Sequence, residues 1–240
     1  MKPVIVIPTY NEAENIEKLI KKIFSLNIPG LEVIIVDDNS PDNTAVIVKN
    51  IPASPAGRQY QISNIHLITR PAKLGLGSAY IAGFKKALDI GADYIFEMDA
   101  DFSHDPDDIP QLLQAAQHAD LVIGSRKIPG GKIIGWGWGR KLMSDGAMWF
   151  SRLLLGLKTE DVTSGFRCFR RQVLESIPLD EVKSNGYAFQ EEMLFRAQKA
   201  GFKIAEVPVT FIDRRAGHSK LSKKDVVEFF LIILKLRKIY

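Results

Sequence analysis

The chain has 240 residues, 46% hydrophobic and 25% charged, which is typical of a folded protein with one large domain or two joined halves. Its single cysteine, Cys168, excludes an internal disulfide and a metal site built from several cysteines, and favours a reducing compartment. The net charge of +4 suits an anionic membrane surface, a phosphate-rich substrate or a nucleic acid alike. Without a signal peptide or a run of roughly 20 apolar residues, we expect a chain that does not cross a bilayer.

Short apolar runs alternate with helical patterns through the first half of the chain. Residues 4–7 form a β-branched run typical of a buried strand, and residues 12–26 carry isoleucine and leucine at the spacing of one helix face. This alternation favours a parallel sheet with helices on both faces. The predicted strands are 4–7, 31–36, 63–69, 94–98 and 121–123, and the predicted helices are 12–26, 42–48, 74–90 and 107–117.

The second half of the chain, after Gly124, is less regular. The segment from Gly130 to Gly139 contains five glycines and two tryptophans, and we predict that it is flexible. We expect the two halves to share packing rather than to form independent domains. The predicted strands here are 163–169 and 204–212, and the predicted helices are 140–155, 188–200 and 223–236.

An acidic motif follows the fourth predicted strand. Its sequence is Glu97-Met98-Asp99-Ala100-Asp101, and alternation along an extended chain would point both aspartates to the same side. Two such carboxylates are costly unless a cation lies between them, and Mg²⁺ and Mn²⁺ prefer oxygen ligands. We predict a divalent-metal site that offsets the charge of a departing diphosphate. The alternative for an isolated Asp-x-Asp is a solvated turn.

Polar side chains also follow the first two predicted strands. Asp37 and Asp38 end the second strand, where a carboxylate can accept a hydrogen bond from a base or ribose. Turn or cap chemistry is the alternative there. After the first strand, the Tyr10 ring is placed to flank a nucleotide base and Glu12 to accept from its amino group. The alternative is that Thr9 or Asn11 caps the first helix.

These segments belong to a longer series that runs through the chain in order. Its members are 8–12 (PTYNE), 36–42 (VDDNSPD), 74–80 (LGLGSAY), 98–104 (MDADFSH), 124–126 (GSR), 163–167 (TSGFR), 186–193 (GYAFQEEM), 206–209 (EVPV) and 213–221 (DRRAGHSKL). Together they resemble the inverting glycosyltransferases of family 2, and more closely the dolichyl-phosphate (polyprenyl-phosphate) mannose synthases. The resemblance implies the α/β fold called GT-A, a mostly parallel sheet flanked by helices, with amphipathic helices at the C-terminus. It implies one catalytic domain at 1–215, with a nucleotide-sugar half at about 1–124 and an acceptor half at about 125–215. A lid loop and an interfacial helix follow at 216–240.

The resemblance also implies a role for each matching position. Asp99 and Asp101 hold Mg²⁺ or Mn²⁺ and the diphosphate, and Ala100 contributes backbone. Ser103, a weaker ligand, stands where some relatives use glutamine to hold the metal. The nucleoside-pocket positions are Pro8, Tyr10, Glu12, Val36 and Asp38, and the cations that face phosphates are Arg126, Arg214 and Lys220.

The implied activity is transfer of mannose from GDP-mannose to dolichyl or polyprenyl phosphate, with inversion. A phosphate acceptor is already ionised near neutral pH, so we nominate no catalytic base and expect a structural role for His104. One alternative is a glucosyl- or other hexosyltransferase that uses another nucleotide sugar. Another is a nucleotide-binding or membrane-scaffold protein without catalysis, and binding to nucleic acid is disfavoured.

Aromatic and basic residues alternate in two segments, which suits a lipid–water interface. We therefore expect a cytoplasmic enzyme, peripheral on the cytosolic face of a membrane, with a possible anchoring partner or self-association. The alternative is that both helices pack on the core or on another subunit. The segments hold Trp136, Trp138, Met143, Met148, Trp149 and Phe150 beside Lys132, Arg140, Lys141 and Arg152, and residues 229–234 beside Lys235, Arg237 and Lys238.

Overall fold

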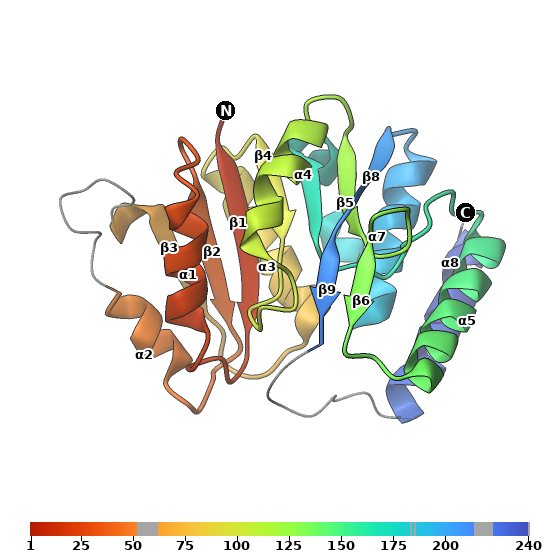
Figure 1. The fold of residues 1–240 in the computed structure, drawn as a ribbon, viewed down its shortest axis with the longest axis horizontal. Helices are drawn as coiled ribbons and strands as arrows, with labels where there is room; N and C mark the ends of the chain where they lie inside the picture. Colours follow the sequence, from red (N-terminus) through yellow and green to blue (C-terminus); the bar gives the residue numbers. More distant parts are fainter. Residues whose placement is uncertain (52–61, 183, 185, 214–222, 240) are drawn as a thin grey trace.

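The computed structural model describes residues 1–51, 62–182, 184, 186–213 and 223–239, and shows a central sheet with helices on both faces (Figure 1). Within the described residues this sheet has seven strands in the order β3-β2-β1-β4-β7-β5-β8. Strand β7 alone runs antiparallel to its neighbours β4 and β5 in that sheet. Strands β6 and β9 form a separate parallel pair. The fold is the mostly parallel α/β fold that the sequence predicts.

The bounds of the elements follow the chain. The strands are β1 (Pro3–Thr9), β2 (Glu32–Asp37), β3 (Ile65–Thr69), β4 (Tyr94–Glu97), β5 (Leu121–Ser125), β6 (Lys132–Ile134), β7 (Arg167–Arg170), β8 (Ile204–Pro208) and β9 (Thr210–Ile212). The α-helices are α1 (Ile16–Ser25), α2 (Thr44–Lys49), α3 (Leu76–Asp89), α4 (Ile109–Ala115), α5 (Trp138–Leu155), α6 (Arg171–Ser176), α7 (Tyr187–Lys199) and α8 (Lys223–Ile239).

The sheet divides the hydrophobic core into two layers. Successive side chains of a strand point to opposite faces, so Val4 and Val6 pack with α3 while Ile5 and Ile7 pack with α1. Both faces of β1 are covered, which is why its sequence is an unbroken apolar run rather than an alternating one. Helices α5 and α8 lie side by side at the edge of the molecule beyond β5 and β8 (Figure 1). None of the helices in the described residues is both apolar enough and long enough to traverse a bilayer.

Three predicted elements of the second half differ from the observed ones. The predicted strand at 204–212 is two strands, because β8 pairs with β5 up to Pro208 and β9 then pairs with β6. The glycine-rich segment expected to be flexible contains β6 and the first two residues of α5. The predicted strand at 163–169 begins only at Arg167. Strand β7 lies between β4 and β5, so the sheet is continuous through both halves of the chain.

Candidate active site

The acidic motif lies where the chain leaves the carboxyl end of β4. The strand ends at Glu97, so strand alternation does not orient Asp99 and Asp101 as the sequence argument assumed. Instead the backbone bends, with Phe102 in the left-handed region at φ 60°. The Asp101 carboxylate accepts a hydrogen bond from the Ser103 amide at 3.0 Å. The bend therefore determines how the Asp99 and Asp101 side chains are oriented. The hydrogen bond between the Ser103 amide and Asp101 stabilises it.

Asp99 faces a pocket and is supported from behind. The Tyr80 hydroxyl donates to its Oδ1 at 3.4 Å, and burial together with the Asp99 charge raises the pKa of Tyr80 well above its usual value, which keeps it a donor. The Asp99 amide points to Nδ1 of His104 at 3.5 Å. A β-carbon built on Gly165 would lie 3.9 Å from Oδ2 of Asp99, so this carboxylate opens onto a glycine backbone.

His104 is a packed side chain rather than a base. It is 3% exposed and stacks on Phe166, with a centroid distance of 5.1 Å and an interplanar angle of 16°. Burial, reinforced by the positive charge of Arg126, lowers its pKa to about 4. The imidazole is therefore neutral near pH 7, and its contacts are consistent with the structural role expected from the sequence.

Arg126 reaches the pocket with its charge already compensated. Its guanidinium donates to both oxygens of Asp161 at 2.7 Å and to the Thr163 hydroxyl at 2.8 Å. Burial opposes ionisation of Asp161, but the charge and hydrogen bonds of Arg126 hold its pKa below the usual value. The pair is therefore ionised, fixed in orientation and almost fully buried.

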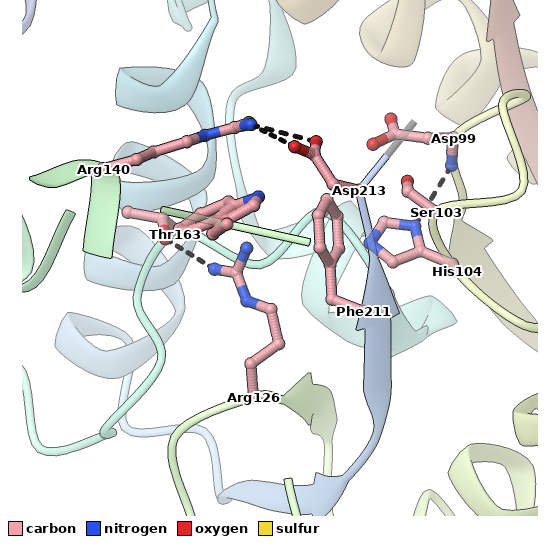
Figure 2. Close-up of a pocket in the computed structure, with 10 residues that line it drawn as sticks. Asp99, Ser103, His104, Arg126, Arg140, Thr163, Phe211 and Asp213 are labelled. Atoms are coloured by element: carbon pink, nitrogen blue, oxygen red, sulfur yellow. Dashed lines mark hydrogen bonds and ion pairs between the residues drawn. The ribbon is translucent and has the colours of Figure 1, made fainter. Parts of the chain in front are cut away.

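The same pocket holds a second arginine, which sequence reasoning did not assign to the chemistry. Arg140, near the start of α5, extends toward Asp213 at the end of β9, and its Nη1 lies 2.9 and 2.8 Å from the two carboxylate oxygens (Figure 2). The guanidinium also lies 4.3 Å from the ring centroid of Trp136. The pocket is lined by Asp99, Ser103, His104, Arg126, Trp136, Arg140, Thr163, Gly165, Phe211 and Asp213.

Both aspartates at the end of β2 are engaged within the protein. Asp37 is fully buried and accepts from the Thr9 hydroxyl at 2.9 Å and from the amide and hydroxyl of Ser40. Asp38 pairs with Arg70 and accepts from the backbone amides of Leu74 and Gly75, just before α3. These contacts match the turn alternative, and a contact between Asp38 and a nucleoside stays a prediction.

The other predicted nucleoside positions lie at the same edge of the sheet. Lys73 places its ammonium 4.2 Å from the centroid of the Tyr10 ring, which closes that ring from one side. Glu12 accepts from the side chain of Asn15 at 3.0 Å. Pro8 and Val36 are paired in the β1–β2 register, and Val36 is fully buried in the core, so it offers backbone but no side-chain surface.

The helix-cap alternative for this segment is wrong. Helix α1 begins only at Ile16, and the Thr9 side chain bonds to Asp37 instead. Asn11 adopts the left-handed region at φ 61° and donates its amide to Ser40. The segment is thus a turn between β1 and α1 that contacts the loop after β2.

A buried ionisable group lies beneath the pocket. Arg167 is fully buried and donates to the backbone carbonyls of Ser164, Val162 and Gln190 at 2.6 to 2.9 Å. Burial raises the pKa of Glu97, its register partner in β4, to about 8, and that of Glu191 to about 8. Through its bonds to Val162 and Ser164, the Arg167 side chain supports the loop that carries Gly165.

Two predicted cations, Arg214 and Lys220, lie outside the described residues, as does most of the predicted lid loop. Of the other predicted site residues, the structure brings Asp99, Ser103 and Arg126 to one pocket. Ala100 is buried beside Asp99, and Asp101 lies at the bend that joins Asp99 to Ser103.

Comparison with known proteins decides the family. The sequence matches the family described as Glycosyl transferase family 2 over residues 4–177, which covers β1 to α6 and the aspartates of the acidic motif. The chain belongs to this family. It is therefore a glycosyltransferase, and the family resemblance drawn from its motifs is confirmed.

Two relatives of this glycosyltransferase are similar over most of their length. An undecaprenyl-phosphate mannosyltransferase of Micrococcus luteus is 42% identical over 222 residues, which cover 92% of this chain and 88% of the relative. A polyprenol monophosphomannose synthase of Mycolicibacterium smegmatis is 41% identical over 228 residues, which cover 95% of this chain and 83% of the relative.

Solved structures share the fold of this glycosyltransferase at lower identity. One is glucosyl-3-phosphoglycerate synthase from Mycobacterium tuberculosis, in complex with Mn²⁺, uridine diphosphate and glucosyl-3-phosphoglycerate. It has a TM-score of 0.66 and 19% identity, and the match covers 98% of this chain and 79% of that one. At this identity the comparison establishes the GT-A-like fold.

The donor atoms at the acidic motif fit a hard divalent cation. Asp99 and Asp101 supply carboxylate oxygens, and the Ser103 hydroxyl is buried at the pocket with no hydrogen-bond partner among the described residues. No group of three acidic, histidine or cysteine side chains suited to a metal occurs in the described part of the chain. Asp99, Asp101 and Ser103 are therefore the residues that would hold such an ion.

Proposed function

We propose that this glycosyltransferase transfers mannose from GDP-mannose to a polyprenyl phosphate, with inversion at the anomeric carbon. The observation that carries the proposal is its similarity, at 42% identity over 92% of the chain, to an undecaprenyl-phosphate mannosyltransferase. The chemistry of the pocket supports it, since one wall carries Asp99 and the other carries Arg126 and Arg140 (Figure 2). Such a pocket suits a phosphorylated donor and an anionic acceptor.

The donor half of the reaction is assigned to the ends of β1, β2 and β4. Tyr10 and Glu12 flank the nucleoside, and the backbones at Pro8 and Val36 border it. Asp99, Asp101 and Ser103 would hold Mg²⁺ or Mn²⁺, and this ion supplies the positive charge that offsets the leaving diphosphate. Ala100 contributes its backbone at the same place.

The acceptor half requires positioning more than proton transfer. A phosphate monoester is ionised near neutral pH, and His104, with its pKa lowered to about 4, is not poised to act as a base. Arg140 is partly exposed at the pocket and is placed to orient the acceptor phosphate for in-line attack. Arg126 is fixed by Asp161, so it contributes a guanidinium of preorganised orientation whose charge Asp161 balances. Arg214 and Lys220 are the further cations that we assign to the phosphates.

We assign the membrane contact to one face of α5 together with α8. Trp138, Leu142, Trp149 and Leu153 recur at helical spacing and are 82%, 65%, 66% and 65% exposed. An exposed apolar face of this kind, with Lys141 beside it, suits the interface of an anionic bilayer. This placement would bring the pocket, whose Arg140 lies on the same helix, close to a lipid headgroup on the cytosolic side.

The double substitution Trp149→Glu/Leu153→Glu should weaken binding to vesicles of phosphatidylglycerol and phosphatidylcholine by at least about tenfold, because it removes two apolar anchors and adds negative charge. Cosedimentation measures the effect. Val46→Glu is the control, since Val46 is an apolar residue 50% exposed on α2, away from this face. Equal binding of the double variant and the wild type would refute the assignment.

The function itself is tested by incubating the purified chain with labelled nucleotide sugars, Mg²⁺ or Mn²⁺, and undecaprenyl phosphate. We expect label from GDP-mannose in the lipid fraction, none from UDP-glucose, and loss of the product with chelator. The configuration of the product by NMR reports inversion. If only UDP-glucose supported transfer, the enzyme would be a glucosyltransferase rather than a mannosyltransferase. If no donor supported transfer, the proposed function would be wrong.

A further inference from the structure

Two Arg–Asp ion pairs at the pocket differ in the solvent exposure of their side chains. Arg126 and Asp161 have side chains 5% and 0% exposed, so their ion pair is a fixed part of the interior. Arg140 and Asp213 have side chains 37% and 29% exposed. An ion pair at that exposure is worth little and exchanges readily with other charged groups.

We propose that Asp213 lowers the affinity for the acceptor by competing with the acceptor's phosphate group for Arg140. The inference rests on the proposed function. Figure 2 shows the Asp213 carboxylate on the Arg140 guanidinium, at the edge of the pocket that also holds Asp99. The carboxylate thus occupies the position on Arg140 that an incoming oxyanion needs.

The contacts around the pair allow the Asp213 carboxylate to leave Arg140 while the arginine stays in place. Arg140 is held by α5 and by the Trp136 ring 4.3 Å away, contacts that do not involve Asp213. The Asp213 backbone donates to the carbonyl of Ile134 at 2.9 Å, which continues the β6–β9 pairing. Rotation of the Asp213 side chain is therefore sufficient to uncover Arg140.

Charge decides which ligand displaces the carboxylate. A phosphate monoester carries nearly two negative charges and can bind a guanidinium through two oxygens, so it outcompetes a single carboxylate. A phosphodiester or a carboxylic acid carries one charge and has no such advantage. Displacing Asp213 costs the same free energy for every anion, so Asp213 is inferred to lower the affinity for all of them by the same factor, and the monoester remains the tightest binder because of its own charge.

Asp213→Asn tests the inference because it removes the charge and keeps the shape. Calorimetric titration with a short-chain prenyl phosphate, without donor, should give a Kd about three- to tenfold lower than in the wild type at low salt, and the difference should shrink as salt is added. The methyl ester of the same phosphate, a diester, binds more weakly but should gain by a similar factor. Asp213→Ser should change both affinities in the same direction.

Arg140 provides the decisive comparison. If the two side chains compete as proposed, Asp213→Asn gives no gain in affinity when Arg140 is replaced by Gln, so the double variant binds like Arg140→Gln alone. Weaker or unchanged monoester binding in Asp213→Asn would overturn the inference, while mannosyl transfer by the wild type would leave the proposed function standing. A wild type that neither binds the prenyl phosphate nor transfers mannose overturns the proposed function instead.

Discussion

Asp99→Asn is expected to lower kcat/KM for mannosyl transfer by at least about a thousandfold, because it removes a charged oxygen ligand from the site assigned to the cation and the diphosphate. The amide is close to the carboxylate in shape, and the hydrogen bond from Tyr80 can still be accepted by its oxygen. Initial rates with GDP-mannose and undecaprenyl phosphate measure the effect. The rate should not recover at high acceptor concentration, because the lost interaction belongs to the donor side.

The matched control for this prediction is Asp105→Asn. Asp105 follows the same motif but is exposed, and its carboxylate accepts only a local amide, that of Asp107, in the hydrogen bonds described. We expect it to retain transfer within about twofold and to lose at most about 1 kcal/mol of stability through the weakened turn. An Asp99→Asn enzyme that keeps more than a tenth of wild-type activity while folded would contradict the assignment of Asp99.

The part of the site at the strand ends was predictable because parallel strands place their carboxyl ends at one edge. The polar segments after β1, β2 and β4 were each visible as acidic or turn residues behind an apolar run, and the register pairs β1 with both β2 and β4. The order of strands and helices along the chain was enough to predict that these segments lie together. The family motifs added roles to these positions.

The remaining part depends on contacts between residues distant in sequence. Asp213 lies 73 residues from Arg140, and Asp38 lies 32 residues from Arg70, so neither partner could be chosen from local pattern. Strands β6 and β9 are three residues each, too short for a periodicity argument. The alternation argument for the two aspartates of the acidic motif failed because the chain turns at the end of β4.

Asp161→Asn should reduce the free energy of unfolding by about 3 to 5 kcal/mol, because it leaves the Arg126 guanidinium buried without a counter-charge. The Asp161 carboxylate accepts three hydrogen bonds from Arg126, two from the side chain and one from its backbone amide at 2.9 Å. The amide side chain can accept through one oxygen only, so at least one of these donors loses its partner. Urea unfolding followed by circular dichroism gives the difference as a lower midpoint.

The adjacent residue supplies the comparison that separates burial from geometry. Glu160 pairs with Arg152 through two hydrogen bonds of 2.6 and 2.9 Å, a bidentate contact like that of Asp161, but the two side chains are 50% and 34% exposed. Glu160→Gln should therefore cost less than about 1 kcal/mol. If both variants lost the same free energy of unfolding, the Arg126 guanidinium would have to be solvated in the folded protein. In that case Arg126, like Arg140, would be available to exchange its carboxylate for a phosphate.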